Sequence, residues 1–256
     1  MQAIRPLAGR VAVVTGGARG MGAAIASELA GQGARVAICD LDGAAVEERA
    51  RALAEAHGST QILGLETDVT DEGAVRALMQ ATARRFGGAA DIPVNNAGVL
   101  FGTRFAQISL AEWNIVLGVN LTGSFLCCRE ALPSMRERRW GRIVNMSSSA
   151  GRSVSTLGGA HYTAAKAGVL GLTRALAKEA ACDGVIVNAV CPGLIDTEMA
   201  RRHCTPERLE AYARSFPVAR LGTAEEVAQL VALLCGPDMA YVTGASLDIN
   251  GGDLMM

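Results

Sequence analysis

The segment RVAVVTGGARGMG, residues 10–22, joins a strand pattern to a helix pattern through glycines, and this junction decides the fold. Residues 10–16 form a β-branched apolar run that ends in glycine. The sequence then continues as MGAAIASELAGQG, residues 21–33, with apolar residues at helical spacing and a glycine at the end. The pattern predicts a buried strand, a tight turn and a helix.

The same alternation recurs along the chain. Further strand patterns occupy residues 34–40, 61–68, 91–98, 141–148, 185–193 and 244–251, and helix patterns between them include 43–58, 72–87 and 224–236. Apolar strands alternating with amphipathic helices are typical of a parallel sheet with helices on both faces. The sequence therefore predicts a single α/β domain over 1–256, a Rossmann-type doubly wound sheet. Pro93 lacks an N–H group, so we expect it at the start of its strand.

Composition excludes several classes of protein. The chain has 256 residues, a net charge of −1 and 50% hydrophobic residues, enough to bury a large core. The balanced charge argues against nucleic-acid binding, and neither a ~20-residue apolar run nor a signal-peptide pattern is found, so no membrane association is expected. Seven scattered cysteines without a C-x-x-C pair indicate reduced, mostly buried thiols in a cytoplasmic protein and no metal site.

Glycines follow the first strand at the sheet edge where such folds bind ligands. Gly16, Gly20 and Gly22 permit a tight turn and let backbone N–H groups approach a pyrophosphate at a helix N-terminus. Asp40 ends the second strand, where a carboxylate accepts hydrogen bonds from an adenosine ribose and repels a 2′-phosphate. This favours NAD, with NADP the less favoured cofactor. Arg19 leaves NADP open, because a guanidinium there can hold a 2′-phosphate.

Four motifs stand in a fixed order: TGGARGMG (15–22), NNAG (95–98), NMSSSAG (145–151) and YTAAK (162–166). With them the chain resembles the short-chain dehydrogenase/reductase family over nearly its whole length. The resemblance implies a phosphate loop, a strand end beside the cofactor, a serine segment and a catalytic Tyr-x-x-x-Lys. Each motif alone is unspecific, but the ordered set is highly specific.

Tyr162 and Lys166 lie one helical turn apart, on one face of a helix. A neighbouring cation favours the phenolate, which takes a proton from an alcohol while hydride passes to the nicotinamide. In reduction the tyrosine returns the proton. His161 is adjacent, and we expect it to serve packing because neighbouring residues on a helix face different ways.

The resemblance assigns two more catalytic residues, Asn120 and a serine. Asn120 holds a water that links Lys166 to solvent in that family. The pattern N-x-S-S-x-x-G selects Ser148, whereas the commoner spacing of thirteen residues before Tyr162 selects Ser149; we choose Ser148. Successive residues of an extended segment point to opposite sides, so we expect only one of the two to reach the substrate.

Cofactor contacts implied by the resemblance share the carboxyl-end edge of the sheet. They are Gly16, Arg19, Gly20, Met21, Gly22, Asp40, Leu41, Asp68, Val69, Asn96, Ala97, Gly98, Tyr162, Lys166, Pro192, Gly193, Ile195 and Thr197. Asp68 and Val69 are expected to end the third strand.

A substrate pocket and lid are expected from the remaining segments. Leu100, Phe101, Leu194 and Ile195 predict an apolar wall, together with residues 155–161, and residues 194–217 predict the lid. Arg201, Arg202 and His203 on that lid are able to meet an anionic substrate, but a solvated charge cluster is the commoner outcome.

Three functions are considered. The first is hydride transfer between NAD(H) and a secondary alcohol or ketone, a small-molecule substrate. The alternative is an NADPH-dependent 3-oxoacyl-thioester (acyl-carrier-protein) reductase. A non-catalytic nucleotide sensor is disfavoured because the serine, tyrosine, lysine and asparagine are all present. A final apolar strand at the sheet edge, 244–251, predicts pairing with other copies, and the resemblance implies a homotetramer.

Overall fold

Seven parallel strands form one sheet in the order β3–β2–β1–β4–β5–β6–β7. The computed structural model describes residues 5–58 and 61–256, so residues 1–4 and 59–60 of the predicted domain lie outside the description. The strands are β1 Val11–Thr15, β2 Arg35–Asp40, β3 Ile62–Glu66, β4 Ile92–Asn95, β5 Gly141–Met146, β6 Val185–Pro192 and β7 Ser246–Ile249. The order turns back between β1 and β4, which places the ligand-binding crevice of a doubly wound sheet there.

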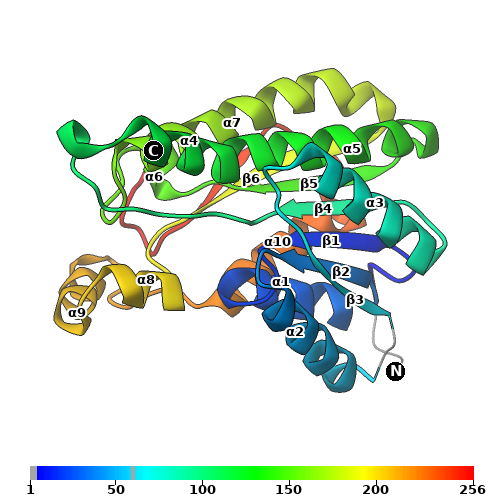
Figure 1. Cartoon of the computed structure of the whole chain (residues 1–256), viewed down its shortest axis with the longest axis horizontal. Coiled ribbons are helices and arrows are strands. Elements are labelled where there is room, and N and C mark those ends of the chain that lie inside the picture. The colour runs from blue at the N-terminus through cyan, green and yellow to red at the C-terminus, as the bar shows by residue number, and fades with distance from the viewer. Residues whose placement is uncertain (1–4, 59–60) are drawn as a thin grey trace.

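Helices cover both faces of the sheet (Figure 1). One layer contains α1 Gly20–Gly31, α2 Gly43–Ala56 and α10 Ala224–Cys235. The other contains α3 Glu72–Phe86, α4 Leu110–Leu117, α5 Gly123–Arg138 and α7 Ala160–Ala180. A short α6, Ser149–Arg152, follows β5, and α8 Glu198–His203 and α9 Pro206–Ser215 lie in the predicted lid segment. The predicted doubly wound α/β fold is confirmed.

Alternate residues of β1 supply both core layers. Ala12 and Val14 pack in the cluster that includes Ile25 of α1 and Val231 of α10. Val11 and Val13 pack in the cluster that includes Leu78 of α3. Since successive side chains of a strand point to opposite faces, a strand that is apolar at every position needs helices on both sides.

Pro93 lies at the start of its strand, as predicted. It is the second residue of β4 and pairs in register with Val13 of β1. Pairing of β4 with β5 begins only at Val94, so the central sheet accommodates a residue without an N–H group. The third strand is shorter than predicted: β3 ends at Glu66, and Asp68 and Val69 follow it.

All seven cysteines are free, six of them buried and Cys182 exposed, in agreement with the expected reduced thiols. One continuous helical stretch, Leu110–Arg138, has the length and apolar composition of a membrane span. Core helices of doubly wound domains satisfy the same criteria. In this stretch α5 contributes Cys128, Ala131 and Met135 to a cluster with β5 and β6, as a core helix does.

Candidate active site

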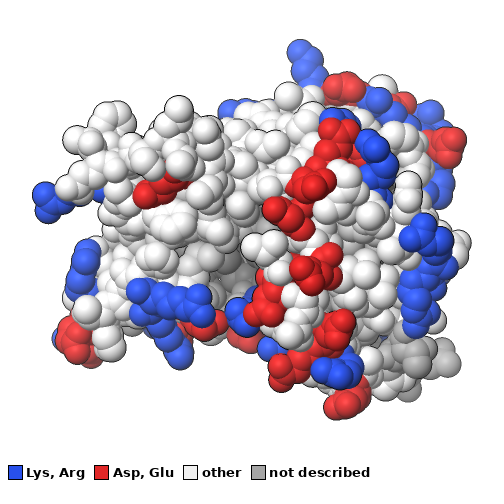
Figure 2. Space-filling model, in the orientation of Figure 1, with Lys and Arg blue, Asp and Glu red and all other residues white. Residues whose placement is uncertain are grey.

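Two cavities adjoin at the carboxyl ends of the strands. The long cleft, about 500 Å³, runs from the loop after β1 to the lid, and the small cavity, about 110 Å³, lies between α7 and the lid. Figure 2 shows the molecule hollowed beside the α8–α9 segment, with acidic side chains gathered on the opposite side of the hollow. Both cavities share four lining residues: Met21, Leu100, Thr197 and Met199. A ligand in the long cleft therefore meets a ligand in the small cavity at this junction.

The structure brings most predicted cofactor residues together in the long cleft. Those that line it are Gly16, Arg19, Gly20, Met21, Gly22, Asp40, Leu41, Asp68, Val69, Asn96, Ala97, Gly98 and Thr197. Tyr162, Gly193 and Ile195 line the small cavity. Lys166 and Pro192 line neither cavity; Lys166 is buried, and Pro192 is the last residue of β6.

The glycine loop after β1 is shaped to receive an anion. Gly16 and Gly20 have φ angles of 62° and 53°, the left-handed region that glycine adopts without strain. A Cβ at Gly22 would lie 2.1 Å from the Gly16 carbonyl oxygen, so only glycine fits there. Helix α1 begins without a side-chain cap or an acidic residue in its first turn. Its first N–H groups are thus available to a phosphate.

Asp40 lies at the cleft, and its side chain makes no ion pair within residues 5–58 and 61–256. Its carboxylate accepts hydrogen bonds from the backbone N–H groups of Ala18, at 3.3 Å, and Asp42, at 3.4 Å. Arg19 pairs with Asp42 instead, at 2.7 Å between Nη2 and Oδ2. Both partners of that pair are exposed, and such pairs contribute roughly 0–1 kcal/mol, so Arg19 remains able to move.

Thr15 ties the glycine loop to the end of β4, a role that the sequence patterns did not single out. Its hydroxyl accepts hydrogen bonds from the backbone N–H groups of Asn96 and Ala97, each at 3.0 Å. The Asn96 amide in turn donates to the carbonyl oxygens of Thr15, at 2.9 Å, and Gly16, at 3.1 Å. A threonine that ends a strand just before a glycine loop is the signal for this brace.

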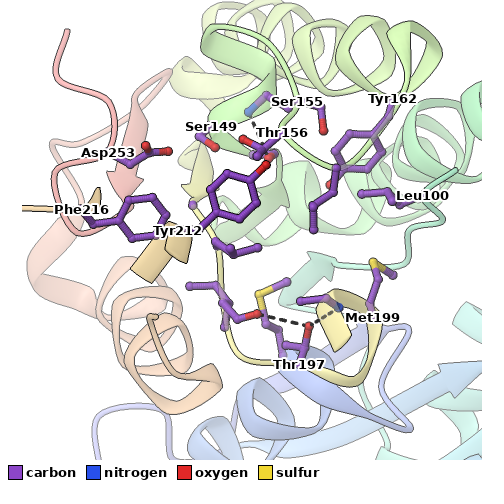
Figure 3. Close-up of a pocket in the computed structure, with 18 residues that line it drawn as sticks. Leu100, Ser149, Ser155, Thr156, Tyr162, Thr197, Met199, Tyr212, Phe216 and Asp253 are labelled. Carbon is purple, nitrogen blue, oxygen red and sulfur yellow. Dashed lines mark hydrogen bonds between the residues drawn. The ribbon is translucent and has the colours of Figure 1, made fainter. Parts of the chain in front are cut away.

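Tyr162 lies in the first turn of α7 and faces the small cavity (Figure 3), which Ser148 also lines. The Ser148 hydroxyl caps α6, accepting from the Ala150 N–H at 3.1 Å, and hydrogen-bonds the Tyr162 phenol. Burial raises the pKa of Tyr162 to about 12, while the Ser148 hydrogen bond acts in the opposite direction. At neutral pH the phenol therefore holds its proton.

Lys166 lies next to Tyr162, but the pKa values of the two side chains differ from what the sequence predicts. Its side chain is 4% exposed, and Nζ donates to the Met146 carbonyl oxygen at 2.8 Å and lies 5.7 Å from the Tyr162 ring centre. Burial lowers the pKa of Lys166 to about 8. The expected fall in the Tyr162 pKa is not seen, because loss of hydration outweighs the lowering by the Ser148 hydrogen bond.

Asn120 sits in a π-helical turn, Gly118–Thr122, between α4 and α5. Its side chain is 1% exposed, and its Nδ2 donates to the carbonyl oxygens of Val99 and Val116, both at 2.9 Å. Its Oδ1 is buried without a hydrogen-bond partner among the described residues. A Cβ at Gly98 would lie 2.8 Å from this oxygen and 3.7 Å from Lys166 Nζ, so both atoms flank Gly98. Such π-turns are frequent at functional sites.

Both candidate serines line the small cavity, so which of them reaches the substrate stays a prediction. The chain is not extended here: Ser149 begins α6, so its side chain does not simply alternate with that of Ser148. Ser148 hydrogen-bonds the Tyr162 phenol, and within the described residues Ser149 makes no such bond. Ser147, by contrast, is buried and donates to the Lys166 carbonyl oxygen at 2.8 Å, as expected of a strand-end residue.

The lid supplies one side of the small cavity. Figure 3 shows Tyr212 and Phe216 from the α9 region facing Tyr162 and Leu100 across it. Phe101, predicted for the substrate wall, lines the long cleft instead, whereas Leu100 lines both cavities.

The charged residues of α8 are mostly paired. Arg201 makes two bonds to Asp196, each 2.8 Å, and Arg202 pairs with Glu198 at 2.6 Å. Arg202 and His203 also line the long cleft. Within residues 5–58 and 61–256, no group of three or more His, Cys, Asp or Glu side chains is placed to hold a metal ion.

Comparisons with known proteins find that this chain is similar to reductases named for acyl-carrier-protein or CoA thioesters, although the names refer to two different reactions. Residues 16–253 match the family model described as enoyl-(acyl carrier protein) reductase. The chain is 40% identical to 3-oxoacyl-(acyl-carrier-protein) reductase FabG of Aquifex aeolicus, over 96% of this chain and 98% of that protein. It is 42% identical to acetoacetyl-CoA reductase of Rhizobium meliloti, over 95% and 98%.

A solved structure gives the same answer. The crystal structure of a 3-oxoacyl-(acyl-carrier protein) reductase with bound NAD from Brucella melitensis superposes with a TM-score of 0.90 at 35% identity. The match covers 98% of this chain and 94% of that one.

Proposed function

We propose that this chain, which belongs to the short-chain dehydrogenase/reductase family, reduces the 3-oxo group of acyl thioesters to a 3-hydroxyl group, with NADH favoured over NADPH. Membership of this family assigns the protein to the oxidoreductases. The thioester is proposed because relatives of 40% and 42% identity are named for 3-oxoacyl and acetoacetyl thioesters. These names support the alternative function weighed from the sequence over a plain secondary-alcohol dehydrogenase.

One observation supports Tyr162 as the proton donor. Tyr162 and Ser148 stand hydrogen-bonded in the small cavity, beside its junction with the long cleft, and burial keeps the phenol protonated. A protonated phenol is ready to donate to a carbonyl oxygen. The bound cofactor supplies the hydride to the carbonyl carbon.

The chain's own residues handle the proton. The Tyr162 O–H donates its proton to the substrate oxygen as the carbonyl becomes an alcohol, and the Ser148 hydroxyl stabilises the developing negative charge by a hydrogen bond. Lys166 and Asn120 lie behind the tyrosine, where Nζ and Oδ1 flank Gly98. We assign to them the return of a proton to Tyr162 from solvent.

The cofactor fits the residues that are present. The uncapped start of α1 would hold the pyrophosphate, and the Asp40 carboxylate would accept hydrogen bonds from the hydroxyls of the adenosine ribose. Arg19 is drawn to Asp42 rather than over the ribose position, which supports NADH. The remaining expected contacts, including Lys166, Pro192, Gly193, Ile195 and Thr197, form the nicotinamide end in this proposal.

We also propose one catalytic domain with residues 194–217 as its lid, working in the cytoplasm as a homotetramer on a small-molecule substrate, without nucleic-acid or membrane binding. β7 is the sheet edge, and Tyr241, Met255 and Met256 near it are fully or largely exposed. An apolar edge of this kind is usually covered. Sedimentation of the purified protein at micromolar concentration tests this: a tetramer is expected, and monomer alone would contradict it.

A substrate panel tests the proposed reaction. Acetoacetyl-CoA and a simple methyl ketone without a thioester are compared with NADH and with NADPH. We expect the thioester with NADH to give the highest kcat/KM, by at least tenfold over the simple ketone. Preference for the simple ketone would return the protein to the secondary-alcohol dehydrogenases.

A further inference from the structure

We propose that His161 is a positioning residue for Tyr162: it caps helix α7 from within the first turn, and Glu112 of α4 holds its ring. This inference rests on the proposed function, because it concerns how the proton-donating tyrosine is held. The sequence marked His161 only as packing, and the fold confirms that it is buried, with 0% exposed. Its two ring nitrogens nevertheless both make polar contacts.

His161 takes the place of the side-chain N-cap that helix α7 lacks. The residue before α7 is Gly159, which has no side chain to satisfy the first N–H groups of the helix. The His161 Nδ1 accepts the hydrogen bond of the Tyr162 N–H at 2.9 Å. The same N–H lies 3.1 Å from the Gly159 carbonyl oxygen, so the histidine shares it. The backbone nitrogen of the catalytic tyrosine is thus held by an imidazole.

The contacts determine the tautomer of His161. A backbone N–H can only donate, so Nδ1 must carry the lone pair and the ring proton sits on Nε2. Nε2 lies 2.7 Å from Glu112 Oε1 and donates to it. Hydrogen bonds from Thr103 and then from His161 hold the pKa of Glu112 below its usual value, so the acceptor is a carboxylate.

The loop before α7 packs closely against the His161 and Tyr162 side chains. A Cβ at Gly159 would lie 2.9 Å from His161 Cε1 and 2.7 Å from the Thr103 carbonyl oxygen. A Cβ at Gly158 would lie 3.0 Å from Tyr162 Cβ. The two glycines therefore let the loop before α7 close over both rings. Removing the Nδ1 acceptor is expected to loosen the backbone from which the phenol projects.

The first test separates the acceptor from the packing. His161→Phe keeps an aromatic ring but loses Nδ1, and His161→Asn loses the ring but keeps an oxygen near the place of Nδ1. We expect kcat for thioester reduction to fall tenfold or more in His161→Phe, with the KM for NADH within twofold, and to stay within threefold of the unmodified value in His161→Asn. His161 would serve packing alone if His161→Phe had a lower melting temperature but an unchanged kcat. The same conclusion would follow if His161→Asn lost more kcat than His161→Phe.

Glu112 offers a second pair of variants. Glu112→Gln keeps an oxygen that accepts from Nε2 and should retain kcat within threefold. Glu112→Ala leaves Nε2 unpaired and should lose as much as His161→Phe. Equal rates in the two Glu112 variants would overturn the role of this carboxylate.

Two readouts do not depend on turnover. Nitrogen-15 NMR of the imidazole should show the proton on Nε2, and a proton on Nδ1 would refute the cap. The ultraviolet titration of Tyr162, identified by its absence in Tyr162→Phe, should shift in His161→Phe and not in His161→Asn. If the protein reduces no 3-oxo thioester, the proposed function fails, and these two readouts still decide the role of His161.

Discussion

Replacement of Asp40 by alanine should move the cofactor preference toward NADPH. The carboxylate is held by two backbone N–H groups and makes no ion pair within the described residues. Its full charge therefore faces whatever lies beside the adenosine ribose. Arg19, the nearest candidate for neutralising a 2′-phosphate, is paired with Asp42.

The magnitude follows from Coulomb's law. A carboxylate and a phosphate dianion about 5 Å apart repel by about 1.5 kcal/mol at the dielectric constant of water, and by more where the site is partly dry. Since about 1.4 kcal/mol corresponds to a tenfold ratio, unmodified protein should favour NADH at least about tenfold in kcat/KM. Asp40→Ala should remove this preference and weaken the use of NADH, because the ribose hydroxyls lose their acceptor.

The assay compares kcat/KM for NADH and NADPH in the unmodified protein, in Asp40→Ala and in the control Asp42→Ala. Asp42→Ala releases Arg19 but keeps the Asp40 charge, so it should improve NADPH use less than Asp40→Ala does. A preference for NADPH in the unmodified protein would refute the role assigned to Asp40. That result would show that Arg19 dominates the site.

Three further predictions follow from the site. Ser148→Ala should lower kcat far more than Ser149→Ala, because only Ser148 bonds the phenol; the reverse order in steady-state rates would select Ser149. Gly22→Ala should weaken NADH binding at least tenfold, since the new Cβ would lie 2.1 Å from a carbonyl oxygen, whereas Gly31→Ala in the same helix should bind normally in fluorescence titration; equal affinities would contradict the tight-turn argument. The unfolding free energy relative to Lys166→Met should rise by up to about 3 kcal/mol between pH 8 and pH 10.5, because the unfolded chain still holds a proton that the folded lysine has released. A constant difference in denaturant titrations would show that burial does not depress this pKa.

The parallel strands and both helix layers follow from patterns that can be read in the sequence. A strand such as Val11–Thr15, apolar at every position, has no solvent face, and glycine at its end forces the turn that receives a ligand. The position of Tyr162 at a cavity, one helical turn from the buried Lys166, likewise follows from helical spacing and the ordered motifs.

Other features depend on contacts between segments that are distant in the chain. The sequence does not show that Asp42 takes Arg19, that the chain turns at Ser149, or that Phe101 faces the long cleft. The direction of the Tyr162 pKa also needs the fold, because it reflects burial of the phenol against a hydrogen bond with Ser148. The spacing of residues around Asn120 also does not reveal that the helix has a π-helical turn there.

The proposed thioester reduction requires Tyr162 as the proton donor. The direct measurement is NADH consumption with acetoacetyl-CoA by the unmodified protein and by Tyr162→Phe, with NADH affinity measured in both. We predict a loss of ~10²–10⁴-fold in kcat for Tyr162→Phe with an unchanged Kd for NADH, because general acid catalysis typically contributes that much. Near-normal turnover in Tyr162→Phe would contradict the mechanism.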